Sequence, residues 1–164
     1  MQKIVLLFLG DADRATINYQ GIEQKLAKDY AIGQYIASND IDQIQEFFAG
    51  FNTDHESLLI TILAHGGADC ISAKMTATDW NRLPYSDLLR FIAACRTENS
   101  LTLNLVAPCN TVNVIPSVAT HNIDEVWYTI DESDSLHFGL TAAEQGFIKF
   151  SFMDEKNLFF RYQR

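Results

Sequence analysis

The sequence predicts an α/β protein, a three-layer α/β/α sandwich in which helices cover both faces of a mostly parallel sheet. Two apolar runs are the main observation behind this prediction. LLITILAHGG at Leu58–Gly67 and LTLNLVA at Leu101–Ala107 are continuous hydrophobic segments, as in strands buried on both faces. Amphipathic segments separate such runs, and strands that alternate with helices form parallel sheets. The 164 residues match one core of ordinary size, so we expect a single domain over residues 1–164.

The first half of the chain alternates between short apolar runs and amphipathic segments. KIVLLFL is typical of a buried strand, and in two later segments apolar residues recur at helical spacing. In order, we expect a strand at Lys3–Leu9, a polar loop at Asp11–Arg14, a helix at Tyr19–Tyr30, a strand at Ala31–Ala37, and a helix that is capped by Ser38–Asp40 and presents Ile41, Ile44, Phe47 and Phe48.

The second half continues the alternation after the strand at Leu58–Ala64. Its clearest helix carries Leu88, Leu89, Ile92 and Cys95 on one face, and Thr141 to Glu144 has the pattern of a capping box. In order, we expect a small β-hairpin or loop at Ala68–Trp80, a helix at Tyr85–Arg96, a strand at Leu101–Ala107, an exposed, mobile loop at Thr111–Asn122, a strand at Val126–Ile130, a helix from Thr141 to Phe150 and a last strand at Leu158–Tyr162.

Composition excludes some classes of function. A net charge of −9 argues against a nucleic-acid partner, because phosphate binding needs a basic face and no Lys/Arg cluster reverses the balance. No apolar run is long enough to cross a membrane, and MQKIVLLFLG does not read as a secretory signal. Three cysteines, Cys70, Cys95 and Cys109, have no zinc-site spacing, which favours reduced thiols. We therefore expect a cytoplasmic protein without membrane or nucleic-acid partners.

Polar residues follow the two longest apolar runs where each predicted strand ends. His65 and Gly66 close the first run, and Cys109 follows the second. Open α/β sheets place their sites at the carboxyl ends of strands, so these side chains meet if the strands are neighbours. A histidine that takes a thiol proton makes the sulfur a nucleophile, and the backbone N–H groups of Gly66 and Cys109 are candidate oxyanion donors. An inert core cysteine and a structural histidine also fit this pattern.

Three segments together resemble the caspase-like cysteine peptidases, particularly the CHAT branch: LLITILAHGG, LPYSDLLRFI and LTLNLVAPCN. The first strand and helix are similar to the opening of that family. The resemblance implies a caspase-like fold with His65 as general base and Cys109 as nucleophile. It implies oxyanion donors at Gly66 and Cys109, a protein or peptide substrate, no cofactor, and latency until a partner or a cleavage orders the loops. We expect no metal site, because His137 with Asp131 and Asp134 has no recognisable calcium or magnesium ligand spacing. Pro108, the lack of a glycine soon after Cys109 and the short chain depart from the family pattern.

Charged residues after the first strand are the candidates for substrate recognition, since the resemblance places specificity groups there. Asp11 and Asp13 suggest a basic residue before the scissile bond, whereas the adjacent Arg14 would suit an acidic one. Two further functions remain open. One is a catalytically silent caspase-like adaptor or oligomerisation module. The other is a flavodoxin-like signalling or binding domain in which the acidic pair binds Mg²⁺ and no thiol is reactive.

Overall fold

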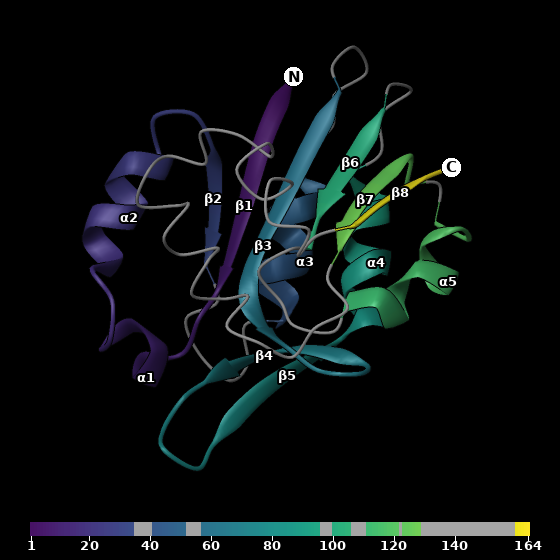
Figure 1. Cartoon of the computed structure of the whole chain (residues 1–164). Helices are drawn as coiled ribbons and strands as arrows, with labels where there is room; N and C mark the ends of the chain where they lie inside the picture. Colours follow the sequence, from purple (N-terminus) through teal and green to yellow (C-terminus); the bar gives the residue numbers. More distant parts are fainter. Residues whose placement is uncertain (35–40, 52–56, 96–99, 106–110, 122, 129–159) are drawn as a thin grey trace.

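A mostly parallel sheet with strand order β2-β1-β3-β6-β7-β8 forms the centre of the computed structural model (Figure 1). The structure describes residues 1–34, 41–51, 57–95, 100–105, 111–121, 123–128 and 160–164. The first five strands of that order run parallel, and β8 is antiparallel to β7. The strands are β1 (Gln2–Phe8), β2 (Ala31–Gln34), β3 (Leu58–Gly66), β6 (Leu101–Asn104), β7 (Glu125–Tyr128) and β8 (Phe160–Gln163).

Helices cover both faces of this sheet, because successive side chains of each strand point to opposite faces. In β1, Ile4, Leu6 and Phe8 pack in one buried cluster with residues of α3 (Ile41–Ala49) and α4 (Tyr85–Ala94). Val5, Leu7 and Leu9 pack in a second cluster with Ile22 and Leu26 of α2 (Tyr19–Leu26). The predicted three-layer α/β/α class with a mostly parallel sheet is therefore confirmed.

β3 lies at the centre of the sheet and extends past its neighbours. It pairs with β1 from Gln2 opposite Leu58 to Phe8 opposite Ala64, and with β6 from Leu58 opposite Leu101 to Thr61 opposite Asn104. The strand then continues through His65 and Gly66 and pairs antiparallel with β4 (Cys70–Lys74). β4 and β5 (Trp80–Pro84) form a hairpin, one of the two alternatives, hairpin or loop, that the sequence predicts for Ala68–Trp80. The second strand of this hairpin continues past the predicted segment to Pro84.

Two segments predicted as loops are helical. Residues 11–14 form a single helical turn, α1 (Asp11–Arg14). Residues 111–118 form η1 (Thr111–Val114) and α5 (Ile115–Val118), so the prediction of an exposed loop from Thr111 is wrong for these residues. Val114 and Val118 are buried four residues apart and face the core, and Pro116 stands in the first turn of α5, where its missing N–H is not needed.

Several predicted features lie outside the described residues: the cap at Ser38–Asp40, the nucleophile segment Pro108–Asn110, the helix from Thr141 to Phe150, and the residues Asp131, Asp134 and His137, for which we expect no metal site. Among the helices that the structure does describe, none combines the length and apolarity needed to cross a membrane.

Candidate functional site

His65 stands at the junction of the central sheet and the β4–β5 hairpin. Its backbone belongs to β3 and pairs with Ser72 of β4, and its side chain is 33% exposed. This is the carboxyl-terminal edge of the parallel strands, where the sequence predicts the site. The imidazole is held by contacts with two elements, α1 and the hairpin.

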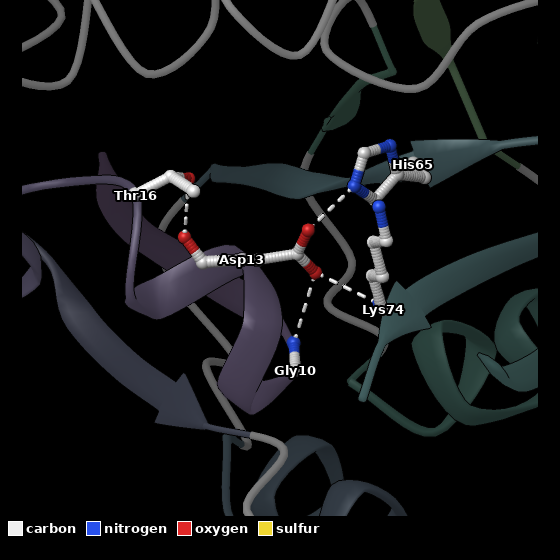
Figure 2. A network of polar contacts seen from close by, with 5 residues as sticks. All are labelled: Gly10, Asp13, Thr16, His65 and Lys74. Carbon is white, nitrogen blue, oxygen red and sulfur yellow. Dashed lines mark hydrogen bonds and ion pairs between the residues drawn. The ribbon is translucent and has the colours of Figure 1, made fainter. Parts of the chain in front are cut away.

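The carboxylate of Asp13 is the polar partner of His65 (Figure 2). Its Oδ1 lies 2.7 Å from His65 Nε2, and its Oδ2 accepts backbone N–H groups of Gly10 at 3.0 Å and Lys74 at 2.8 Å. Thr16 Oγ1 donates to the Asp13 carbonyl at 2.8 Å, a local hydrogen bond that stabilises the helical turn α1. Only 8% of the Asp13 side chain is exposed. Both carboxylate oxygens are thus occupied by donors of the protein itself.

The glycine between β1 and α1 makes this network possible. Gly10 precedes α1, and its N–H reaches the Asp13 side chain three residues on, as in one half of a capping box. A Cβ at Gly10 would overlap the carbonyl group of Lys74. The exit of β1 and the end of β4 therefore lie in direct backbone contact, which brings Lys74 N–H to the same carboxylate.

The Asp13 carboxyl group is ionised at neutral pH. Burial alone would raise its pKa, but the hydrogen bond from His65, the two backbone hydrogen bonds and the charge of His65 together bring the pKa below its ordinary value. A carboxylate has no proton to donate, so His65 Nε2 carries the hydrogen and donates it. His65 Nδ1 is then the ring nitrogen that can accept a proton.

This network makes a pH-dependent contribution to stability. Since the pKa of Asp13 is lower in the folded than in the unfolded chain, the contribution is complete above the unfolded value near 3.8 and is lost as pH falls through the folded value. We expect the difference in free energy of unfolding between the wild type and Asp13→Asn to be largest above about pH 5 and to shrink below about pH 4. Urea unfolding at several pH values measures it. A difference that is the same at pH 3 and pH 7 would contradict this assignment.

The structure places the other predicted site residues as follows. Gly66 pairs with Ile71 of β4, and the next N–H, that of Gly67, is donated to the Cys70 carbonyl at 2.9 Å. Asp11 is exposed in the first turn of α1. Cys109 lies outside the described residues, but the strand that leads to it, β6, is the direct neighbour of β3, as the dyad hypothesis requires.

A hollow of about 500 Å³ opens beside His65 on the outer face of the β4–β5 hairpin. Its lining includes Cys70, Ser72, Trp80 and Arg82 from the two strands and Asp69 from the turn between β3 and β4. The Trp80 ring meets the His65 ring edge to face, with centroids 5.0 Å apart. In the described residues, no cluster of His, Cys, Asp and Glu side chains has the size and arrangement to hold a metal ion.

The two cysteines that the structure describes are poor nucleophiles. The pKa of the Cys70 thiol is raised by burial and by the charge and hydrogen bond of Asp69, against a smaller lowering by Arg82. Burial raises the pKa of Cys95 to about 12, and its thiol donates to the Phe48 carbonyl. Neither thiol forms an appreciable thiolate at neutral pH.

The sequence analysis does not identify Trp80 and Arg82 as site residues, nor Asp13 as the partner of His65. The sequence does contain a pattern that could have indicated Trp80 and Arg82. In CISAK and WNRLP, the buried residues Ile71, Ala73 and Leu83 alternate with exposed or half-buried neighbours, the pattern of strands with one solvent-facing side. Continuing that face from Ser72 across the hairpin leads to Arg82, which is its partner in register.

Comparison with known proteins gives a likeness in fold. The chain matches no family model and no curated protein sequence. It does superpose on the X-ray structure of a secreted C11 cysteine protease from Bacteroides thetaiotaomicron in complex with an irreversible peptide inhibitor, at 12% identity and a TM-score of 0.50. The match covers 79% of this chain and 49% of the protease, so the chain spans about half the length of that protein. The architecture is thus the caspase-like α/β fold of that neighbour.

Proposed function

We propose that the protein is a cysteine endopeptidase of caspase-like, CHAT type in which His65 and Cys109 form the catalytic dyad. The observation that carries the proposal is the orientation of His65 by an ionised, buried carboxylate at the carboxyl edge of the sheet. Orientation of a histidine by a buried acid is what general-base catalysis on a nucleophile requires. The fold likeness to a cysteine protease supports the same class of function.

The chemistry follows from the free nitrogen of His65. Nδ1 takes the proton of the Cys109 thiol, and the thiolate attacks the peptide carbonyl carbon. The N–H groups of Gly66 and Cys109 stabilise the oxyanion of the tetrahedral intermediate. When the intermediate collapses, His65 gives the proton to the leaving amine and an acyl-enzyme remains. Water, deprotonated by His65, then hydrolyses the thioester and frees Cys109. Asp13 keeps the imidazole in the required orientation throughout.

The rest of the proposal concerns the substrate and its control. Because the Asp13 oxygens are engaged, Asp11 is the acid left at the exit of β1 to hold a basic residue before the scissile bond. The substrate is a protein or peptide, and the enzyme acts in the reducing cytoplasm, where the thiols stay reduced. The enzyme stays latent until a partner protein or a cleavage switches on the activity.

The test is the pH dependence of alkylation of Cys109 by iodoacetamide, read out by peptide mass spectrometry. In the wild type we expect Cys109 to react quickly below neutral pH, and in His65→Ala we expect the rate at pH 6 to fall about tenfold or more, because the thiolate loses its proton acceptor. Cys70 and Cys95 are internal controls in the same chain, and their raised pKa values predict slow labelling in both proteins.

A Cys109 that labels no faster than Cys70, and with no effect of His65→Ala, would contradict the dyad and favour the silent adaptor. If the dyad is present, libraries of peptides with Arg or Lys before the cleaved bond give the substrate preference. Asp11→Asn then tests the acid that the proposal assigns to that residue.

A further inference from the structure

We propose that the hollow beside His65 binds the substrate residue that follows the scissile bond, and that Arg82 selects a carboxylate there. The position of the bound residue relative to the scissile bond rests on the proposed function. The preference for a carboxylate rests on the residues that line the hollow. Three observations support it: the charges that line the face, the aromatic wall, and the position of His65.

The charge on this face is opposite to that of the chain as a whole. The protein has a net charge of −9, yet the hairpin carries Arg82 in the lining of the hollow and Lys74 on the same face, beside Trp80. The Arg82 guanidinium has no hydrogen bond or ion pair with any residue that the structure describes, and Arg82 is exposed. A planar guanidinium with all its donors available is suited to bidentate binding of a carboxylate.

An aromatic side chain, that of Trp80, lies on the same face of the hairpin as these two cations. Trp80 is 39% exposed, which is unusual for so large an apolar group, and it pairs with Lys74 in register while Arg82 lies two residues further on the same face. The Lys74 ammonium lies 5.7 Å from the centroid of the Trp80 ring. An exposed indole beside a donor-rich cation offers apolar contact to the substrate backbone next to a polar anchor for its side chain.

The place of the hollow in the reaction follows from the role of His65. In the proposed mechanism, this histidine protonates the leaving amine, so it stands on the side of the scissile bond from which the substrate continues. A hollow that has the His65 ring in its wall therefore receives that side of the substrate.

One group in the hollow opposes a carboxylate ligand. Asp69 is an anion in the lining, and its charge and hydrogen bond act on the Cys70 thiol. Arg82 acts on the same thiol with the opposite sign, so both charges reach this region. The lining itself holds one charge of each sign, and Lys74, which lies outside the lining beside Trp80 on the same face, adds a second cation that favours an acidic ligand.

The test is an NMR titration of the full chain that follows the two indole N–H resonances. The probes are Asp-Ala-Ala-NH₂, its Asn and Lys analogues, and Ala-Ala-Ala with a free C-terminal carboxylate. We expect the Trp80 resonance to shift saturably with the Asp probe and about fivefold weaker binding of the Asn probe, since one charge-assisted pair is lost. The Trp127 indole, which donates to Glu125, is an internal reference that should not move. Trp80→Phe assigns the two signals.

Arg82→Gln should remove the preference for Asp over Asn. Arg90→Gln is the matched control, because it deletes the same charge from an exposed ion pair with Asp87 on α4 and should leave the preference intact. Equal affinities for the Asp and Asn probes, or tighter binding of the Lys probe, overturn the proposal. Tight binding of the free C-terminal carboxylate shows that the site takes the anion from a chain end rather than a side chain. Binding of these probes does not need Cys109, so a negative alkylation result and a negative titration are separate outcomes.

Discussion

Replacing Asp13 by asparagine is expected to lower kcat/KM for peptide hydrolysis by about 10²- to 10⁴-fold, the range seen when a buried acid behind a catalytic histidine is neutralised. The reason is the hydrogen bonding of the site. Two backbone N–H groups, from Gly10 and Lys74, require an acceptor at the position of Oδ2. The asparagine oxygen satisfies them only if the amide nitrogen takes the position of Oδ1.

That amide nitrogen then faces His65 Nε2, which is 2.7 Å away in the wild type. An amide N–H donates, so the imidazole must accept at Nε2 and carry its hydrogen on Nδ1. The ring nitrogen that should take the thiol proton is thereby blocked. The side chain keeps its shape, but the histidine is in the wrong tautomer.

The nitrogen-15 shifts of the His65 ring report the tautomer without reference to activity. We expect hydrogen on Nε2 in the wild type and on Nδ1 in Asp13→Asn. Asp87→Asn, which removes an exposed carboxylate from the ion pair with Arg90, is the control and should leave both tautomer and rate unchanged. A folded Asp13→Asn protein with the wild-type tautomer, or with a rate within a fewfold of the wild type, contradicts the assigned role. Urea unfolding at neutral pH establishes that the variant is folded.

Gly10→Ala is expected to destabilise the fold by about 3 kcal/mol, at the upper end for overpacking, because the clash is with backbone. The added Cβ would overlap the carbonyl group of Lys74, and neither strand end can move without breaking the Asp13 hydrogen bonds. Alkylation of Cys109 at pH 6 should slow as well, since His65 loses its fixed partner. Urea denaturation and the labelling assay measure the two effects.

Gly50→Ala is the matched control for this variant. At Gly50, which follows α3, a Cβ would make only close but permitted contacts with backbone carbonyl oxygens of Phe47 and Glu46, the nearest at 3.4 Å. We expect a change of less than about 0.5 kcal/mol in either direction. If Gly10→Ala were as mild as Gly50→Ala, the close approach of β1 and β4 would not constrain the site.

The position of His65 is predictable from the sequence because a long apolar run that stops at a polar residue marks a buried strand and its end. The neighbouring place of β6 follows from the same logic, since consecutive parallel strands often pair. The hairpin after His65 is also visible as an alternating pattern. These features depend on periodicities within a few residues, which a sequence displays directly.

The partner of His65 is not predictable in that way. The charged residues after β1 suggest a substrate-binding role for Asp13 as readily as for Asp11. Which of them turns inward depends on the single helical turn of α1 and on a contact 52 residues away in the chain. The helical turns at residues 111–118 are not predicted for a related reason. A proline and small polar residues suggest a loop there, whereas packing of Val114 and Val118 on the core holds the segment helical.

The network around Asp13 joins three separate stretches of chain, at sequence separations of 52 and 61 residues. Local elements such as α2 or the β4–β5 hairpin can form early, but this contact needs the parallel pairing of β1 with β3, and loop closure over such distances is slow. We therefore expect His65 to become oriented late in folding. If His65 is the base of the proposed dyad, Cys109 gains its proton acceptor only when the two ends of the network meet.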